Sequence, residues 1–540
     1  MPSHAPASSA PTRIDPVAAS ASEIIGGPLG RHAGTLGRAA RSGWQPAAAV
    51  LVGLSSLTVA LGFLQKGHCF TKGWNNPDQF WHACYTDLPV SSGLGHAMPY
   101  LPGAPHLDQP LISGVVMWLV GLAVPDGSVR VQQQWYFALW SVLITVLVMV
   151  LVLVTAASVP RAPWRAAHVA LSPVLVLAGL ISVDLLGVLL ASIALWAWGR
   201  NKVYLAGLFM GLAISARTYP LILLVAIGLL AVRSGRVGAW ARLAGTTMVT
   251  LLAVSLPFLV VNAGGLVSVY RAWWRGTPSY GSLWMVSGLL GHGLESRLNV
   301  LVILGWVAAL AVGTLFALSM DRRPAVAEVS LVMLVIVVVT GKAMPVQAGL
   351  WLLPLIALAG LKWRDHLIWA GFEATYFVSV WLYIAGLSKP DRGMPTALYS
   401  AITLMRAAAW VYLLVQVWRV ARSRPPAITS EPVQQRLVEH VPADQAPSGQ
   451  ELYDEDFLLG SEGEDSAGQA SVDQESAHDQ ESAHDQVSAD DQVPSDDQVS
   501  ADLESVDLES VDLDLDLDEE VDPLAGPMAD APDQVIVRIS

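Results

Sequence analysis

The sequence predicts an all-α polytopic membrane protein. Of its 540 residues, 53% are hydrophobic and only 14% are charged, and the mean hydropathy of +0.48 is too high for a soluble globular protein. Apolar segments recur from residue 46 to residue 420. The expected fold is a bundle of about twelve transmembrane helices, with a long polar loop after the first helix and a disordered acidic tail after the last.

The N-terminal residues 1–45 are rich in Ala, Pro, Ser and Gly, and they include Arg13, Arg31, Arg38 and Arg41. They lack the short apolar region and small-residue cleavage site that a signal peptide carries at its start. We therefore expect a disordered cytoplasmic lead, followed by a transmembrane domain over residues 46–424.

Twelve apolar segments are expected to cross the membrane. They are residues 46–64, 131–157, 167–181, 184–198, 203–216, 219–232, 242–262, 298–319, 326–340, 346–361, 366–387 and 396–420. Several are shorter than the ~20 residues that a full crossing needs, so their ends must extend into the flanking polar residues.

The segment Pro110 to Val124 is also apolar but has only fifteen residues. If it lies in the interface or re-enters, all six basic loops fall on one side, and that side is cytoplasmic because Lys and Arg accumulate there. These loops are residues 161–165, 199–202, 233–242, 321–324, 362–365 and 419–424. We therefore expect a multi-pass protein of the plasma membrane with both termini in the cytoplasm.

The tail differs from the rest of the chain in charge. From Pro425 onward there are 32 acids and 2 bases, which leaves 13 acids and 29 bases before it. The tail contains imperfect repeats such as DQESAHDQESAHDQVSADDQ and ADLESVDLESVDLDLDLDEE. Such a composition cannot bury enough apolar surface to fold, so residues 425–540 are predicted to be disordered and cytoplasmic. A solvated tail without a partner and a tail that docks on a basic protein both remain open.

The first long polar loop, residues 65–130, is where we expect the chemistry. It contains both cysteines of the chain, Cys69 and Cys84, which would form a disulfide in an oxidising compartment; two buried free thiols are the alternative. It also contains four histidines, but their spacing matches no pattern of metal ligands, so no metal site is expected. The expected topology places this loop outside the cell.

Other polar groups at span ends fall on the same side as this loop. They include Asp184, Arg217 and Lys342. Charged groups gathered at one face of a membrane usually line a cavity or a polar substrate path, although each alone could also contact lipid headgroups. The chain has no P-loop, no Rossmann glycine fingerprint and no H-E-x-x-H, which argues against nucleotide-driven transport, nucleotide cofactors and zincin chemistry. No cofactor and no nucleic-acid partner are expected.

A carboxylate loop together with cationic span ends suits one reaction. An acidic side chain can act as general base on a hydroxyl, while Arg or Lys stabilises a phosphate leaving group. These are the groups that glycosyl transfer from a lipid-phosphate sugar requires.

Five sequence blocks resemble glycosyltransferase family 87. They are CYTDLPV (84–90), MPYLPGAPHLDQPLISGVVMWL (98–119), VDLLGVLLASIALWAWGRNKVYLAGLFMGLAISARTYPLILL (183–224), YRAWWRGTPSYGSLW (270–284) and GKAMPVQAGLWLLPLIALA (341–359). The resemblance covers residues 45–420. It implies a GT-C-type membrane enzyme that transfers a sugar, typically mannose, from a polyprenyl-phosphate donor to a lipid or glycan acceptor of the cell envelope. Transfer would proceed with inversion and without a metal.

The resemblance also implies roles for individual residues. Asp87 matches the aspartate of the family's CY-x-D block and would be the general base, with Asp108 as the second candidate. The other implied residues are Arg217, Lys342 and Arg271 for the donor phosphate, and Tyr100, Tyr219, Trp284 and Gln347 for substrate binding.

Three positions depart from the family pattern. Asp108-Gln109-Pro110 stands where the family often has Glu-Tyr-Pro, and Arg217 replaces a lysine, which keeps the cation and permits a bidentate grip on phosphate. The usual Ser-Pro-Gln-Tyr block is Met344-Pro345-Val346-Gln347-Ala348, so the identity of donor or acceptor is open.

Two other classes of function compete with glycosyl transfer. A transporter or flippase of lipid-linked sugars would often show internal repeats, and we find none between the halves of the chain. A membrane scaffold that recruits partners through the tail would account for the tail but not for the polar loop.

Overall fold

The structure, a computed structural model, describes residues 44–89, 97–423, 522–529 and 531. Within these ranges every regular element is a helix. Most of the predicted N-terminal lead and most of the predicted acidic tail lie outside the described residues.

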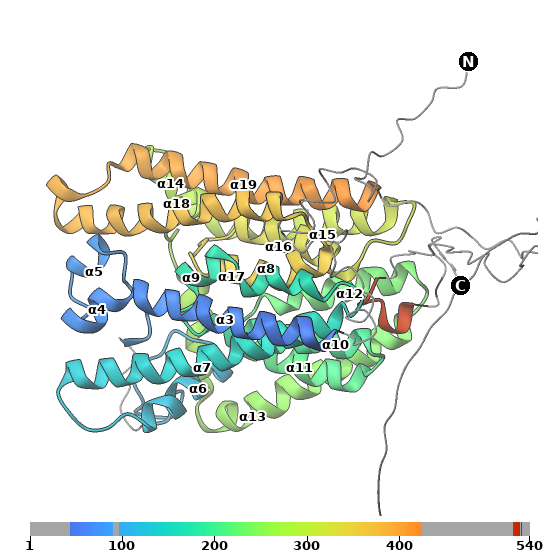
Figure 1. The fold of residues 1–540 in the computed structure, drawn as a ribbon, viewed down its shortest axis with the longest axis horizontal. Helices are drawn as coiled ribbons and strands as arrows, with labels where there is room; N and C mark the ends of the chain where they lie inside the picture. Colours follow the sequence, from blue (N-terminus) through green and yellow to red (C-terminus); the bar gives the residue numbers. More distant parts are fainter. Residues whose placement is uncertain (1–43, 90–96, 424–521, 530, 532–540) are drawn as a thin grey trace, which may run out of the picture. The chain divides into compact units, whose positions relative to one another are not determined.

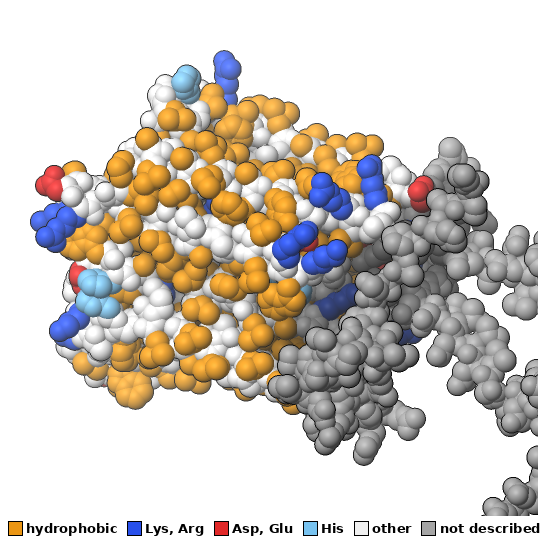
Figure 2. Space-filling view, turned by 45° about the horizontal axis from the view of Figure 1, so that its top comes forward, with side chains coloured by type: hydrophobic (Ala, Val, Ile, Leu, Met, Phe, Trp, Pro, Cys, Tyr) orange, Lys and Arg blue, Asp and Glu red, His pale blue; other side chains and the backbone are white. Residues whose placement is uncertain are grey.

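In the described part of the chain, six helices are long and apolar enough to cross a membrane. They are α3 (Gln45–Gln65), α7 (Val129–Ser158), α13 (Val237–Arg275), α15 (Leu298–Ser319), α18 (Trp363–Ser388) and α19 (Thr396–Ser423). The space-filling view shows hydrophobic side chains over a broad band, with most of the coloured charged side chains toward its ends (Figure 2). Both observations indicate a membrane protein.

Six further apolar helices among the described residues have 10–17 residues, too short to cross unaided. They are α6 (Leu111–Leu122), α10 (Asp184–Gly199), α11 (Val203–Ala216), α12 (Pro220–Arg233), α16 (Val326–Val339) and α17 (Ala348–Ala359). The predicted number of twelve spans is therefore not confirmed.

The predicted span at residues 167–181 is broken into two pieces. The chain forms α8 (Ala167–Ala170) and then α9 (Pro173–Ala178). Pro173 has no N–H to continue the first helix, and the Ser172 hydroxyl accepts a hydrogen bond from the Val174 N–H, which starts a new one. The prediction of a continuous helix here is wrong.

The helices of the bundle lie side by side, and they define two ends (Figure 1). The short helices α4 (Gly67–Lys72) and α5 (Asp78–Trp81) follow α3 at one end, which we call the α5 end. The turn η5 (Gly526–Met528) lies at the opposite end, together with the start of α3 and the end of α19; we call it the η5 end. The described helical body thus begins and ends on one side.

Helix α13 is bent at Asn262, whose backbone leaves the helical region with φ −155° and ψ 76°. The Asn262 side-chain amide donates to the Tyr100 carbonyl at 3.1 Å and its oxygen accepts from the Gly265 N–H at 3.1 Å. The bend therefore anchors α13 to the polar loop and falls where the predicted span 242–262 ends.

Part of the tail is ordered, contrary to the prediction that residues 425–540 are disordered. Leu524, Ala525 and Met528 are at most 1% exposed, and two of them belong to the main hydrophobic core. The acidic repeats lie outside the described residues.

Candidate functional site

A cavity of about 360 Å³ lies among loops at the α5 end. Its lining comes from five parts of the chain: α5 with the loop after it, the turn before α10, the loop before α14 (Leu283–Leu289), the loop before α17, and helix α18. Asp87, Tyr280 and Gln347 provide polar side chains, and Phe80, Tyr85, Tyr376 and Trp381 provide aromatic rings. A cavity that is mostly apolar, with aromatic rings and a few polar groups, is typical of a ligand site.

The backbone around Asp87 is fixed to the turn that precedes α10. The Asp87 N–H donates to the Ile181 carbonyl at 2.9 Å, and the Thr86 hydroxyl donates to the Leu180 carbonyl at 2.8 Å. Thr86 is fully buried. The carboxylate is therefore held in position by segments almost a hundred residues away in sequence.

Opposing effects act on the pKa of Asp87. Burial raises the pKa, and the Tyr85 hydroxyl, which donates to Oδ1 at 2.6 Å, lowers it. Asp184 adds a further raising effect, and Arg217 and Lys66 add lowering ones. The net direction is upward, which makes this aspartate a stronger base than an exposed one.

Lys66 lies beneath the same loop and was not among the predicted site residues. It is fully buried and its Nζ donates to the Tyr85 carbonyl at 2.9 Å. Burial lowers the pKa of Lys66 to about 7, while the negative charge of Asp87 acts in the opposite direction. Nothing in the sequence separates this lysine from others that end a transmembrane helix.

Arg217 lies at the end of α11 in a network of side chains. Its Nε donates to Asp184 Oδ1 at 2.7 Å, and its Nη1 donates to Gln109 Oε1 at 2.6 Å. The Trp351 indole donates to the other oxygen of Asp184 at 2.7 Å, and Tyr219 stacks on Trp351 with ring centroids 5.0 Å apart. Two of the predicted span-end groups, Asp184 and Arg217, are thus brought together, but as partners of one another.

Lys342 occupies a structural position. Its Nζ donates to the carbonyls of Trp273 at 3.0 Å, Trp274 at 2.6 Å and Gly276 at 3.3 Å. These carbonyls belong to the end of α13, where a cation satisfies groups that the helix leaves without partners. The Lys342 carbonyl in turn accepts from the Ser279 N–H at 2.8 Å, which orders a loop that lines the cavity.

The cavity lining does not include the predicted residues Asp108, Arg217, Arg271, Lys342, Tyr100, Tyr219 and Trp284. Asp108 is 73% exposed in its side chain and pairs with His106 at 2.8 Å, and Arg271 is exposed. The Tyr100 hydroxyl donates to the Gln109 carbonyl at 2.7 Å, and the Trp284 indole donates to the Thr340 carbonyl at 3.0 Å. Of the predicted substrate-binding residues, Gln347 lines the cavity.

A buried ion pair supports the loop that carries Gln347. Arg406 of α19 donates to both carboxylate oxygens of Glu373 on α18, at 2.8 and 2.9 Å. Its Nη1 also donates to the Met344 carbonyl, and its Nη2 donates to the Pro345 carbonyl at 2.9 Å. Neither charged residue was predicted as functional, although both lie inside predicted spans, where a charge is itself a signal.

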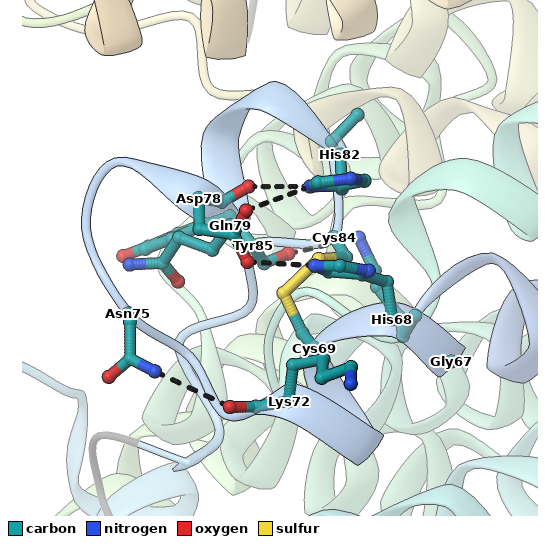
Figure 3. The surroundings of a disulfide bond; sticks show 12 residues. Gly67, His68, Cys69, Lys72, Asn75, Asp78, Gln79, His82, Cys84 and Tyr85 are labelled. Atoms are coloured by element: carbon teal, nitrogen blue, oxygen red, sulfur yellow. Dashed lines mark hydrogen bonds and ion pairs between the residues drawn. A yellow bond between two sulfur atoms is a disulfide. The ribbon is translucent and has the colours of Figure 1, made fainter.

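Cys69 and Cys84 form a disulfide, with Cα atoms 5.8 Å apart (Figure 3). The bridge joins α4 to the segment after α5. Beside it, Asp78 Oδ2 is 2.7 Å from His68 Nε2 and Asp78 Oδ1 is 3.2 Å from His82 Nδ1. These contacts lower the pKa of Asp78, chiefly through the hydrogen bond from His68.

The same three residues are the group in the described chain that comes nearest to a metal site. However, the two imidazoles are stacked, with centroids 3.5 Å apart and planes within 12° of parallel. Ring nitrogens bind metals in the plane of the ring, so two parallel planes cannot share one ion unless a ring turns. The arrangement fits a hydrogen-bonded cluster that stabilises the loop.

Comparison with family models, with curated proteins and with solved structures finds no match to this chain. The residues of the cavity are therefore the basis on which a function is assigned.

Proposed function

We propose that this protein is a membrane glycosyltransferase. It would transfer a sugar, mannose by the resemblance to glycosyltransferase family 87, from a polyprenyl-phosphate donor to a lipid or glycan acceptor of the cell envelope. In this proposal the protein is a GT-C-like bundle of about twelve spans. The shorter helices cross the membrane together with adjacent parts of the same chain, which surround their ends.

The observation that supports the proposal most is Asp87 in the aromatic cavity. Its burial raises its pKa, and its backbone and its carboxylate are both held by hydrogen bonds. A general base needs this combination of basicity and fixed position. Asp108, by contrast, is exposed and lies outside the cavity.

The chemical step assigns one role to Asp87. Its carboxylate removes the proton from an acceptor hydroxyl as that oxygen forms a bond to the anomeric carbon of the donor. The bond from that carbon to the phosphate oxygen breaks, and polyprenyl phosphate leaves with the electron pair. Attack opposite the leaving group inverts the anomeric configuration.

The cavity has the composition that a sugar requires. Tyr280, Tyr376 and Trp381 present rings against which the C–H face of a hexose can pack, while Gln347 and Ser279 offer hydrogen-bonding groups. A volume of about 360 Å³ lies in the range of small-molecule sites.

Arg217 is a candidate partner for the donor phosphate, because it keeps spare N–H groups. Arg217 uses three of its nitrogens on Asp184 and Gln109, but a guanidinium has five N–H groups. Lys342 is committed to three carbonyls, and its role in the proposal becomes that of ordering the loop at residues 276–282.

The proposal places the α5 end outside the plasma membrane and the η5 end in the cytoplasm. The support is the positive-inside rule, because the loops at 161–165, 199–202 and 321–324 are rich in Lys and Arg. A reporter that is active only outside should respond at Ser279, and a cytoplasmic one at Arg200. The reverse result would remove the proposal, because the donor side would be wrong.

The direct experiment uses purified protein in liposomes with labelled polyprenyl-phosphate mannose and envelope lipids as acceptors. A new labelled glycolipid that depends on Asp87 supports the proposal. If the labelled donor only changes leaflet and no product forms, the protein is a flippase of lipid-linked sugars.

A further inference from the structure

The last described part of the chain, residues 522–529 and 531, packs against the η5 end of the bundle; we call it the C-terminal segment. Leu524 and Met528 are at most 1% exposed and belong to the same hydrophobic cluster as the helices. The next residue along, Ala529, is exposed. The segment therefore has a buried face and a free face, as a docked peptide does.

Polar contacts fix the segment to the loop between α15 and α16. Arg323 Nη1 donates to the Met528 carbonyl at 2.6 Å and to the Ala531 carbonyl at 3.3 Å. The Asp522 carboxylate accepts from the Val326 N–H at 3.2 Å, at the first turn of α16. An acid at a helix N-terminus is favourable both as a hydrogen-bond acceptor and by its charge.

Two glycines permit the close approach of the segment to the end of α10. A Cβ on Gly199 would lie 2.6 Å from the Pro523 carbonyl oxygen, and a Cβ on Gly526 would overlap the Trp198 carbonyl. Gly526 also has a φ of +52°, which disfavours other residues. Both partners thus lack a side chain at the point of contact.

We propose that the η5 end carries a docking site for a short apolar peptide flanked by acids, and that its occupant is the C-terminal segment of the same chain. The sequence supports this choice, because the apolar run PLAGPMA directly follows the acidic repeats and differs from them in composition. The site joins α10 to the α15–α16 loop, and Arg323 also contacts Ser234 between α12 and α13 at 3.4 Å.

The intervening chain is long enough for this docking. Residues 424–521 connect the end of α19 to the segment, and both of these lie at the η5 end (Figure 1). The connection therefore does not need to cross the bundle. A tether also raises the effective concentration of its own end near the site, which favours the same chain over a second copy.

The test compares two single cysteines, Ala525→Cys and Ala529→Cys, in the full-length protein. The two native cysteines are joined in a disulfide, so an added thiol is the reactive one under non-reducing conditions. Ala525 is 1% exposed and Ala529 is exposed, and both changes add one sulfur to an alanine. We expect a maleimide to label position 525 at least about tenfold more slowly than position 529.

A release variant makes the test specific. Adding Gly526→Val places a Cβ against Trp198 and leaves the helices unchanged, so labelling at 525 should rise to the rate at 529, while labelling at 529 should stay the same. Equal rates at the two positions in the intact protein would overturn the docking. Protection at 525 that survives Gly526→Val would overturn the assigned site.

Concentration separates the two possible occupants. Docking within one chain predicts that protection does not change when the detergent-solubilised protein is diluted about a hundredfold, because an intramolecular contact is independent of concentration. Protection that disappears on dilution would show that the segment binds a second copy and would overturn the assignment to the same chain. Denatured protein should label equally at both positions.

Discussion

The substitution Asp87→Asn tests the proposed base with little change of structure. Asparagine is nearly isosteric, and its oxygen can still accept from the Tyr85 hydroxyl that now contacts Oδ1 at 2.6 Å. It also removes a charge whose burial is unfavourable. Thermal unfolding of the variant checks the fold, so that a loss of turnover at unchanged stability reports on chemistry.

The expected loss is about 10²- to 10⁴-fold in turnover, the usual contribution of general-base catalysis. That range corresponds to roughly 3–5 kcal/mol of transition-state stabilisation. The assay measures labelled glycolipid formed from polyprenyl-phosphate mannose, and a separate measurement of donor binding should give near wild-type affinity.

Asp108→Asn is the matched control, because it makes the same change at an exposed carboxylate outside the cavity. It should leave turnover unchanged. If Asp87→Asn keeps full activity while Asp108→Asn is inactive, the base has been assigned to the wrong end of the loop. If both are fully active, neither carboxylate is the base.

Three further predictions follow from contacts around the cavity. Tyr85→Phe removes a hydrogen bond that lowers the pKa of Asp87, so that pKa should rise and the acidic limb of the pH–rate profile should move to higher pH; an unmoved limb would mean that another group titrates. Arg406→Met leaves Glu373 buried and unpaired, at a cost of about 3–5 kcal/mol in thermal unfolding, and adding Glu373→Gln should recover part of it; no recovery would exclude this cause. Cys84→Ser opens the disulfide loop and should cost about 3 kcal/mol, whereas a thiol count of two in the unreduced, denatured wild type would show that no bridge forms.

The helices were largely predictable from the sequence because burial in lipid requires long apolar segments. The exception at residues 167–181 shows what a mean hydropathy does not capture. Ser172 and Pro173 are two residues in an otherwise apolar stretch, and they barely change its average. They act on the backbone, through a missing N–H and a capping hydroxyl, and so they divide the helix.

Residues of the candidate site were predictable only where a single residue in a sequence block marks the expected chemistry. Asp87 and Gln347, which were named from the resemblance, line the cavity, and their roles stay predictions. The predicted cations contact other groups of the protein instead. A sequence shows that a charge exists but not which group neutralises it. Arg217 has Asp184 beside it, and Lys342 has the end of α13.

Charged residues inside predicted spans can be recognised directly from the sequence. Glu373 and Arg406 lie within apolar segments, where an unpaired charge is expensive. Two opposite charges on neighbouring spans can be matched from the amino-acid sequence alone. The hydrogen bonds from Arg406 to the Met344 and Pro345 carbonyls cannot be predicted in this way, because they depend on how the loop before α17 folds.

Three groups favour the charged form of the buried Asp87: the Tyr85 hydroxyl, Arg217 and Lys66. Lys66 lies three residues before Cys69 and Asp87 lies three residues after Cys84, so the disulfide brings the cation and the acid to the same place. Burial acts against the charge on each of them, and each favours the charged form of the other. The covalent bridge thus sets the electrostatic surroundings of the proposed base, although the loop that carries this base is mostly irregular backbone.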